Sequence, residues 1–248
     1  MDRKQDKPTL SIVIPLYNEA RRMGRGLEMI RTYIDAANFD CEVVLVNDGS
    51  TDNTAEIARQ AAGDDPRYRI VSYPVNQGKG YAVKTGMLAA RGMIRLFADI
   101  DMSVPIDRAD EFIELIRAGA DVVIGTRKTS ASTVAVHQPK YREVLGEIFR
   151  RSVRAVFAPQ ITDFTCGFKA FTAHAAKSIF AESHIRRWAF DAEILFLASR
   201  WNLDVREIPV TWTDQPGSKV NVMVDVFRSS AELALIRLRW LIGKYRRT

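Results

Sequence analysis

The sequence predicts an α/β fold in which a mostly parallel sheet is covered by helices on both faces. Short apolar runs recur along the first half of the chain, as expected for strands that are buried on both sides. Segments with helical periodicity separate these runs, and polar, turn-rich motifs follow them. A chain of 248 residues favours one domain over two.

The first half alternates strand and helix signals in order. Strands are expected at residues 10–15, 41–46, 69–73, 93–98 and 121–125, where the runs are short and apolar. Helices are expected at residues 22–37, 54–62 and 81–91 and between the last two strands. In a parallel sheet, ligands bind beyond the carboxyl ends of the strands, and the polar motifs of this half fall at that edge.

The second half is less regular. A Ser/Thr-rich stretch from Thr126 to Pro139 predicts a mobile loop, and residues 142–157 have the periodicity of an amphipathic helix that carries arginines. A last amphipathic helix is expected at residues 222–245. Its apolar stripe consists of Met223, Phe227, Ala234, Leu238, Leu241 and Tyr245. Core packing, membrane contact and oligomerisation each explain such a stripe.

Charge and cysteine content narrow the class of protein. The formal net charge is +6, from 36 Lys and Arg against 30 Asp and Glu, which favours anionic partners. Only Cys41 and Cys166 are present, so neither a disulfide framework nor a zinc cluster is indicated and a reducing cytoplasm fits. The polar first ten residues lack a signal-peptide core, and no apolar run approaches the ~20 residues of a membrane span.

Two carboxylates follow the fourth expected strand directly. Asp99 and Asp101 are two residues apart, so both can point into one cleft, and hard divalent cations prefer such oxygen ligands. A Mg²⁺ or Mn²⁺ ion held there could bridge a diphosphate. The alternative is a solvated turn before the next helix.

Three further polar residues sit at the ends of expected strands or in the loops that follow them. Asp48 could accept a hydrogen bond from a nucleobase imide, or it could form an Asx turn. Glu19 could contact the same ligand, or it could be a first-turn acid favoured by the helix dipole. Lys79, in a loop that is not a Walker A sequence, could lie beside a phosphate or in a flexible turn.

The order of these motifs resembles the nucleotide-sugar half of a family 2 glycosyltransferase, which implies the Rossmann-like GT-A fold. The motifs are PLYNE (15–19), NDGSTD (47–52), NQGKG (76–80) and the Asp-x-Asp pair. Motifs of the second half resemble the dolichyl-phosphate glucosyltransferase branch, which is similar to dolichyl-phosphate mannose synthases and bacterial polyprenyl-phosphate glycosyltransferases. These are GTRK (125–128), Arg142, DFTCGFK (163–169), RWAFDAE (187–193) and PGSK (216–219).

The resemblance spans about residues 9–240 and implies a single GT-A domain, 1–248. Within it, about 9–125 form the nucleotide-sugar half, about 126–220 the acceptor half and about 221–248 the amphipathic helix. Many related mannose synthases have Gln at position 103 and Ser at position 146. This chain has Ser103 and Gly146, differences that weaken the mannose-synthase assignment more than the family assignment. We also expect Phe168 and Trp188 to pack beneath the acceptor side.

The resemblance further implies roles for individual residues. The nucleotide sugar is held by Pro15, Tyr17, Glu19, Asp48, Lys79, Asp99, Asp101 and Lys219, and the metal by the two aspartates Asp99 and Asp101. The reacting centre contains Arg127, Arg142 and Asp163, and the acceptor side contains Lys169 and Asp191. Asp163 is expected to organise the site, paired with Lys169 or an arginine, more than to accept a proton.

The expected reaction is transfer of a sugar, first of all glucose from UDP-glucose, to a polyprenyl or dolichyl phosphate with inversion. The enzyme would lie peripherally on the cytoplasmic membrane face, alone or with a membrane-protein partner or a second copy. Alternatives are another donor (UDP-GalNAc or GDP-mannose) and a glycan hydroxyl acceptor, which needs a base such as Asp163 or Asp191. A nucleotidyltransferase is more distant, since PLYNEARRM lacks a glycine-rich signature, and the acidic motifs argue against nucleic-acid binding.

Overall fold

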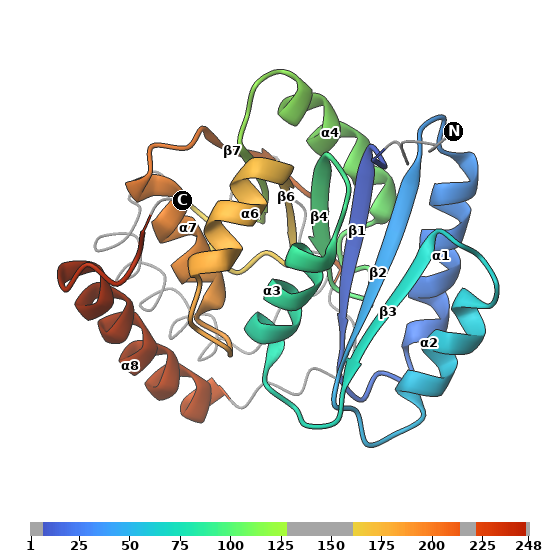
Figure 1. The fold of residues 1–248 in the computed structure, drawn as a ribbon, viewed down its shortest axis with the longest axis horizontal. Coiled ribbons are helices and arrows are strands. Elements are labelled where there is room, and N and C mark those ends of the chain that lie inside the picture. The colour runs from blue at the N-terminus through green and yellow to red at the C-terminus, as the bar shows by residue number, and fades with distance from the viewer. Residues whose placement is uncertain (1–6, 128–160, 214–221, 247–248) are drawn as a thin grey trace, which may run out of the picture.

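Seven strands form one sheet in the computed structural model, which describes residues 7–127, 161–213 and 222–246, with side chains of the last segment from 229 onward. The strand order is β3-β2-β1-β4-β6-β5-β7 (Figure 1). The strands are β1 (Leu10–Leu16), β2 (Cys41–Asp48), β3 (Tyr68–Tyr73), β4 (Ile94–Ala98), β5 (Val122–Thr126), β6 (Phe168–Thr172) and β7 (Val205–Pro209). Only β6 among them runs antiparallel to its neighbours, so the predicted mostly parallel sheet is confirmed.

Helices cover both faces of the sheet, as expected. Apolar side chains of α1 (Met23–Ala36), α2 (Thr54–Ala62) and α4 (Ala109–Arg117) pack on one face. Those of α3 (Lys79–Ala89), α6 (Ala173–Glu182) and α7 (Phe190–Arg200) pack on the other (Figure 1). A short 3₁₀ turn, η1 (Ile106–Arg108), leads into α4, and α8 (Val222–Leu241) lies beside α7.

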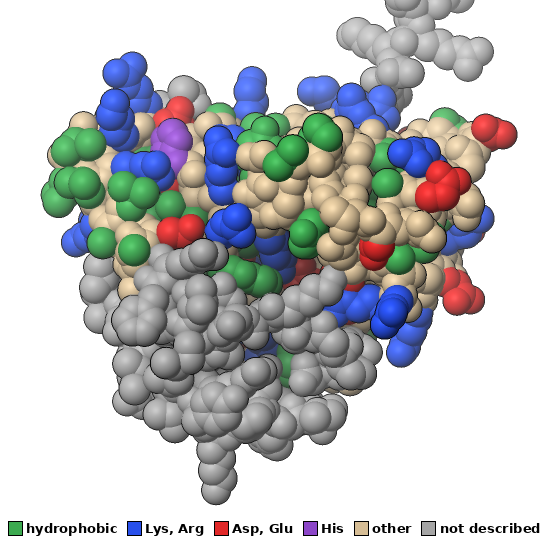
Figure 2. All heavy atoms as spheres, turned by 90° about the horizontal axis from the view of Figure 1, so that it is seen from below, with side chains coloured by type: hydrophobic (Ala, Val, Ile, Leu, Met, Phe, Trp, Pro, Cys, Tyr) green, Lys and Arg blue, Asp and Glu red, His purple; other side chains and the backbone are tan. Residues whose placement is uncertain are grey.

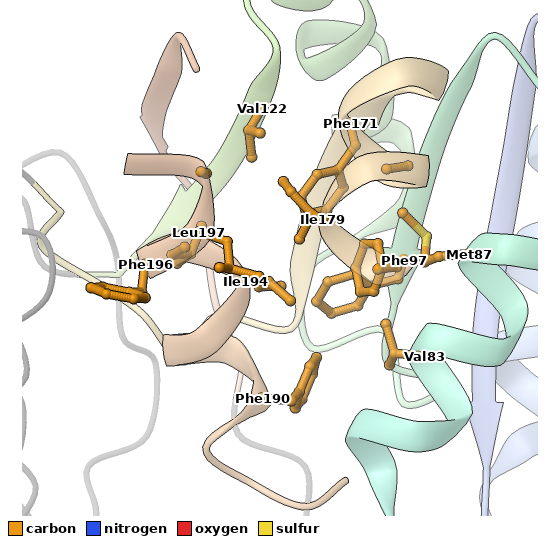
Figure 3. Close-up of a cluster of buried hydrophobic side chains, with 14 of the residues drawn as sticks. Val83, Met87, Phe97, Val122, Phe171, Ile179, Phe190, Ile194, Phe196 and Leu197 are labelled. Carbon is orange, nitrogen blue, oxygen red and sulfur yellow. The ribbon is translucent and has the colours of Figure 1, made fainter. Parts of the chain in front are cut away.

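Alternation along the strands divides the apolar side chains between the two faces. In β1, Val13 belongs to the cluster beneath α3, whereas Ile12 and Ile14 belong to the cluster beneath α1. Figure 3 shows the first cluster, in which side chains of α3, α6 and α7 pack against side chains of β4, β5 and β6. The labelled residues are Val83, Met87, Phe97, Val122, Phe171, Ile179, Phe190, Ile194, Phe196 and Leu197.

The last helix ends earlier than predicted. It stops at Leu241 because Gly243 adopts a left-handed backbone (φ 67°) and the amide of Lys244 bonds back to Arg239. Tyr245 therefore lies beyond the helix, and its buried hydroxyl donates to Glu193 at 2.6 Å. Leu233 and Ile236 face the core instead of the predicted stripe.

Several predicted features fall outside the described residues, namely most of the loop 126–139, the helix at 142–157, and the side chains of Met223 and Phe227. Of the predicted stripe, Leu238 and Leu241 are exposed. Within the described segments, no helix is both long and apolar enough to cross a bilayer.

Candidate active site

Parallel pairing brings the ends of β1, β2 and β4 to one edge of the sheet. Glu19 follows β1, Asp48 ends β2, and Asp99 and Asp101 follow β4. Figure 2 views the molecule from below, toward this edge, and both basic and acidic side chains are visible deep in the middle of that face. The predicted meeting of these motifs is thus present in the fold.

Lys79 forms an ion pair with the first aspartate of the pair. It is the first residue of α3, and its Nζ lies 2.6 Å from Oδ1 of Asp99. The ammonium also lies 5.6 Å from the ring centre of Trp188. Burial alone would lower the pKa of Lys79, but the carboxylates of Asp99 and Asp191 outweigh it, so the pKa is raised and the side chain stays charged.

The second aspartate faces another basic side chain. Arg22 bonds both oxygens of Glu19, and its Nη1 lies 3.9 Å from Oδ2 of Asp101. The other oxygen of Asp101 accepts the amide of Ser103 at 3.0 Å. Between them, Met102 has a left-handed backbone (φ 50°), an uncommon conformation for a residue with a side chain that holds the turn after the two aspartates.

Asp48 is a buried carboxylate that organises the loop before α3. Its Oδ1 accepts the amide of Gln77 at 2.7 Å, and its Oδ2 accepts the amide of Gly78 at 2.9 Å and the Asn76 side chain at 2.7 Å. Gly78 has φ 105°, which a residue with a side chain rarely adopts. Asp48 therefore places Lys79 through the backbone of the residues just before it.

Arg127 and Asp163 form a bidentate ion pair on the opposite side of the site. Nε and Nη2 of Arg127 donate to the two oxygens of Asp163 at 2.7 and 2.9 Å, and the guanidinium lies 5.4 Å from the Trp212 ring centre. Burial would raise the pKa of Asp163, but the hydrogen bonds and charge of Arg127 hold it below its usual range. Glu207 accepts the amides of both Thr162 and Asp163, which fixes this turn.

A third ion pair is buried between the other two. Nζ of Lys169 donates to Oδ1 of Asp191 and to the carbonyl of Cys166, both at 2.5 Å, and Lys169 is fully buried. Burial raises the pKa of Asp191 despite the nearby positive charges of Lys169 and Lys79. Gly167 lies between these groups, and a Cβ there would overlap Oδ2 of Asp99.

The three pairs make one alternating chain of charges across the site. Lys79 acts on Asp191 as well as on Asp99, and Lys169 acts on Asp163 as well as on Asp191. Three basic and three acidic groups balance within this chain, of which Asp163, Lys169 and Asp191 are buried while Lys79 and Asp99 are partly exposed. The order is Asp99, Lys79, Asp191, Lys169, Asp163 and Arg127.

The structure brings most of the predicted site residues together. Pro15 belongs to β1 and Tyr17, 39% exposed, follows it toward the same edge. Arg142 and Lys219 lie outside the described residues. The expectation for Trp188 was wrong, because its ring is 42% exposed beside Lys79, whereas Phe168 is buried against Phe112.

Three contributors were missed from the sequence. Trp212 belongs to none of the motifs described above, yet its ring lies beside Arg127. Glu207 and Gly167 carry no local signal, because each acts through contacts between distant segments. The glycine in DFTCGFK was the available clue, since a glycine ahead of a strand often marks a close approach.

A mostly parallel sheet with an Asp-x-Asp pair and basic side chains at its carboxyl edge defines the GT-A class of glycosyltransferases. The chain belongs to glycosyl transferase family 2, whose sequence pattern matches residues 11–180. It is a glycosyltransferase.

Relatives and solved structures agree with that class. The chain is similar to a dolichyl-phosphate beta-glucosyltransferase of Saccharomyces cerevisiae, with 35% identity over 96% of this chain and 76% of that protein. It is also similar to ALG5C of Trichomonas vaginalis, named likewise, at 34% identity over 86% of this chain; the match spans 66% of that longer protein. Glucosyl-3-phosphoglycerate synthase from Mycobacterium tuberculosis, solved with Mn²⁺, UDP and glucosyl-3-phosphoglycerate, shares the fold at a TM-score of 0.69 and 18% identity, covering 92% of this chain and 80% of that one.

Proposed function

We propose that this protein transfers glucose from UDP-glucose to dolichyl phosphate, or to a related polyprenyl phosphate, at the cytoplasmic face of a membrane. The observation that carries the proposal is the strand edge where Asp99 and Asp101 stand beside Lys79. Relatives named dolichyl-phosphate beta-glucosyltransferase favour this donor and acceptor. We further propose that residues 1–248 act as one GT-A domain, since β6 of the acceptor half pairs with β4 and β5 of the nucleotide-sugar half.

Asp99 and Asp101 are suited to a Mg²⁺ or Mn²⁺ ion. Both offer hard carboxylate oxygens, and the described residues contain no cluster of three or more His, Cys, Asp or Glu side chains that would form a complete protein cage. Such ions are commonly held by one or two carboxylates together with substrate phosphates. When bound, the ion would offset the charge that builds on the departing diphosphate.

The charge network favours a phosphate acceptor over a hydroxyl acceptor. A sugar hydroxyl needs a general base, and Asp163 is engaged by Arg127 while Asp191 is engaged by Lys169. A lipid phosphate is already anionic near neutral pH, because its second pKa is about 6. It needs orientation and charge control, which we assign to Arg127 and Arg142, with Lys79 and Lys219 on the donor diphosphate.

In this proposal, the acceptor oxygen attacks the anomeric carbon in line with the departing diphosphate. The carbon–oxygen bond to UDP breaks as the bond to the lipid phosphate forms, so the configuration inverts. Asp163 then serves to hold Arg127 and takes no proton. Pro15, Tyr17, Glu19 and Asp48 would hold the nucleoside, and Asp48 also keeps the loop before Lys79 in place.

The exposed face of α8 and the turn after it suit a membrane surface. Leu235, Leu238, Leu241 and Ile242 are exposed by 39 to 77%. Figure 2 shows hydrophobic side chains gathered at one end of the molecule with Lys and Arg side chains beside them. Apolar side chains flanked by basic ones bind the headgroup region of anionic bilayers. The free, buried thiols of Cys41 and Cys166 agree with a reducing compartment.

The test is transfer of radiolabel from UDP-glucose into a butanol-extractable lipid with dolichyl phosphate as acceptor. We expect labelled, mild-acid-labile lipid in the presence of Mg²⁺ or Mn²⁺ and none with EDTA. UDP-GalNAc and GDP-mannose serve as competing donors, and a labelled lipid from one of these alone would reassign the sugar. Hydrolysis of UDP-glucose without lipid labelling would show that the acceptor is wrong.

A further inference from the structure

The ammonium of Lys79 lies beside Asp99, one of the two carboxylates proposed to hold the divalent ion. The ammonium is 2.6 Å from Oδ1 of Asp99, whereas Oδ2 of the same carboxylate lies against Gly167. A divalent ion on Asp99 would bind at about 2.0–2.2 Å from the oxygen, so it and the ammonium would compete for one carboxylate. If both lay beside this carboxylate, the divalent ion and the ammonium would repel each other strongly.

The position of Lys79 is set by the fold and not by chance contact of a surface side chain. Asp48 holds the amides of Gln77 and Gly78, and the next turn is tied by the bond from the amide of Tyr81 to the carbonyl of Arg186. The ring of Trp188 lies beside the ammonium. The charged end of Lys79 is thus kept close to Asp99.

A second carboxylate, that of Asp191, also attracts the ammonium of Lys79. Lys169 donates to only one oxygen of that carboxylate, Oδ1. The ammonium can therefore leave Asp99 without losing all electrostatic compensation. An incoming diphosphate would supply further negative charge in the same region.

We propose that Lys79 makes metal binding depend on the donor: it neutralises Asp99 in the free protein and releases it to the divalent ion when a diphosphate arrives. This rests on the proposed metal site. Because coupling between two ligands is reciprocal, the nucleotide then binds more tightly with metal and the metal more tightly with nucleotide. Such a device keeps the enzyme from holding the ion in an unproductive state.

The test measures Mn²⁺ binding by the electron paramagnetic resonance signal of the free ion, first with Mn²⁺ alone and then with saturating UDP. For the unaltered protein, we expect UDP to tighten Mn²⁺ binding at least tenfold. In Lys79→Met, the affinity for Mn²⁺ alone rises about tenfold, and UDP then improves it by less than threefold. Lys177→Met, an exposed lysine on α6, is the matched control and behaves as the unaltered protein.

Lys79→Gln and Lys79→Arg keep the test decisive if the Met variant folds poorly. The first should reproduce the effect of Met, and the second should retain the coupling because it retains the charge. Weaker or unchanged binding of Mn²⁺ alone in both neutral variants would overturn the inference. Binding and transfer are separate readouts: absence of lipid labelling with intact Mn²⁺–UDP coupling would sink the proposed acceptor while leaving the role of Lys79 standing.

Discussion

The guanidinium of Arg127 grips the buried carboxylate of Asp163 through two hydrogen bonds of 2.7 and 2.9 Å. The residues come from the end of β5 and from the turn before β6. Their pairing therefore ties together two segments that lie 36 positions apart in the sequence. In this pair both oxygens of Asp163 are engaged by Arg127, so its negative charge stabilises the fold.

Loss of that carboxylate should destabilise the protein. In Asp163→Asn the bidentate bond is lost and Arg127 keeps a buried charge without its counter-ion, for which breaking a buried pair typically costs about 3–5 kcal/mol. Urea unfolding should reveal the decrease in unfolding free energy. A decrease below about 1 kcal/mol would mean that the pair contributes like an exposed salt bridge.

The same pair predicts a pH dependence. The pKa of Asp163 is depressed in the folded state, so its contribution is present above the unfolded value of about 3.9 and is lost as the pH falls through the lower folded value. The difference in unfolding free energy between the unaltered protein and Asp163→Asn should thus shrink below about pH 4. A difference that stays constant from pH 6 to pH 2.5 would contradict the assignment.

Asp101 should be needed for transfer and not for folding. Its side chain is partly exposed and its nearest basic atom is 3.9 Å away, so Asp101→Ala should change stability by less than about 1 kcal/mol. Lipid labelling from UDP-glucose should fall at least a hundredfold, about 2.7 kcal/mol of transition-state stabilisation. Asp107→Ala, an acidic control in η1, should retain full transfer. Equal activity of the two variants would remove Asp101 from the metal site.

Gly167 should be required for the geometry of Asp99. Gly167→Ala places a methyl group on Oδ2 of Asp99, so the carboxylate must turn away. We expect Mn²⁺ binding with UDP to weaken at least tenfold while the circular dichroism spectrum is kept. Gly24→Ala is the control, because no atom lies within 4 Å of its added Cβ and alanine favours the helix there by roughly 0.5–1 kcal/mol. Unchanged Mn²⁺ binding in Gly167→Ala would show that Asp99 tolerates displacement.

The exposed face of α8 should govern membrane binding. Leu238→Ser combined with Leu241→Ser removes apolar area from that face, and sedimentation with vesicles of phosphatidylcholine and phosphatidylserine should drop severalfold. Leu88→Ser, at an exposed leucine of α3, is the control. If the unaltered protein does not bind vesicles, sedimentation equilibrium tests whether a second copy of the chain covers this face. A dimer would identify that second copy, and a monomer would leave a membrane-protein partner as the occupant.

The first five strands were predictable because each is a compact apolar run. In β1 and β2 nearly every residue is buried, so hydrophobicity alone marks them. Strands β6 and β7 escaped prediction for a physical reason. β6 is a short strand interrupted by Lys169, whose charge is buried against Asp191, and β7 has two charged residues among five.

The acidic half of the site was likewise readable from the sequence, because its residues follow strands directly. Their partners were not, since Lys79 reaches Asp99 from the start of α3 and Arg22 reaches Asp101 from before α1. Which cation meets which carboxylate depends on packing between segments far apart in the chain. Trp188 shows the limit most clearly: a large aromatic ring was expected inside, and it is instead exposed beside the ammonium of Lys79.

The hydroxyl of Tyr245 connects the segment after α8 to the residues that pack against the loop before α3. It donates to Glu193, whose other oxygen holds the amides of His184 and Ile185, just before the segment that packs against Gly78 and Gly80. A deletion that removes Tyr245 should loosen the loop 76–80, although the deletion lies far from that loop in the sequence.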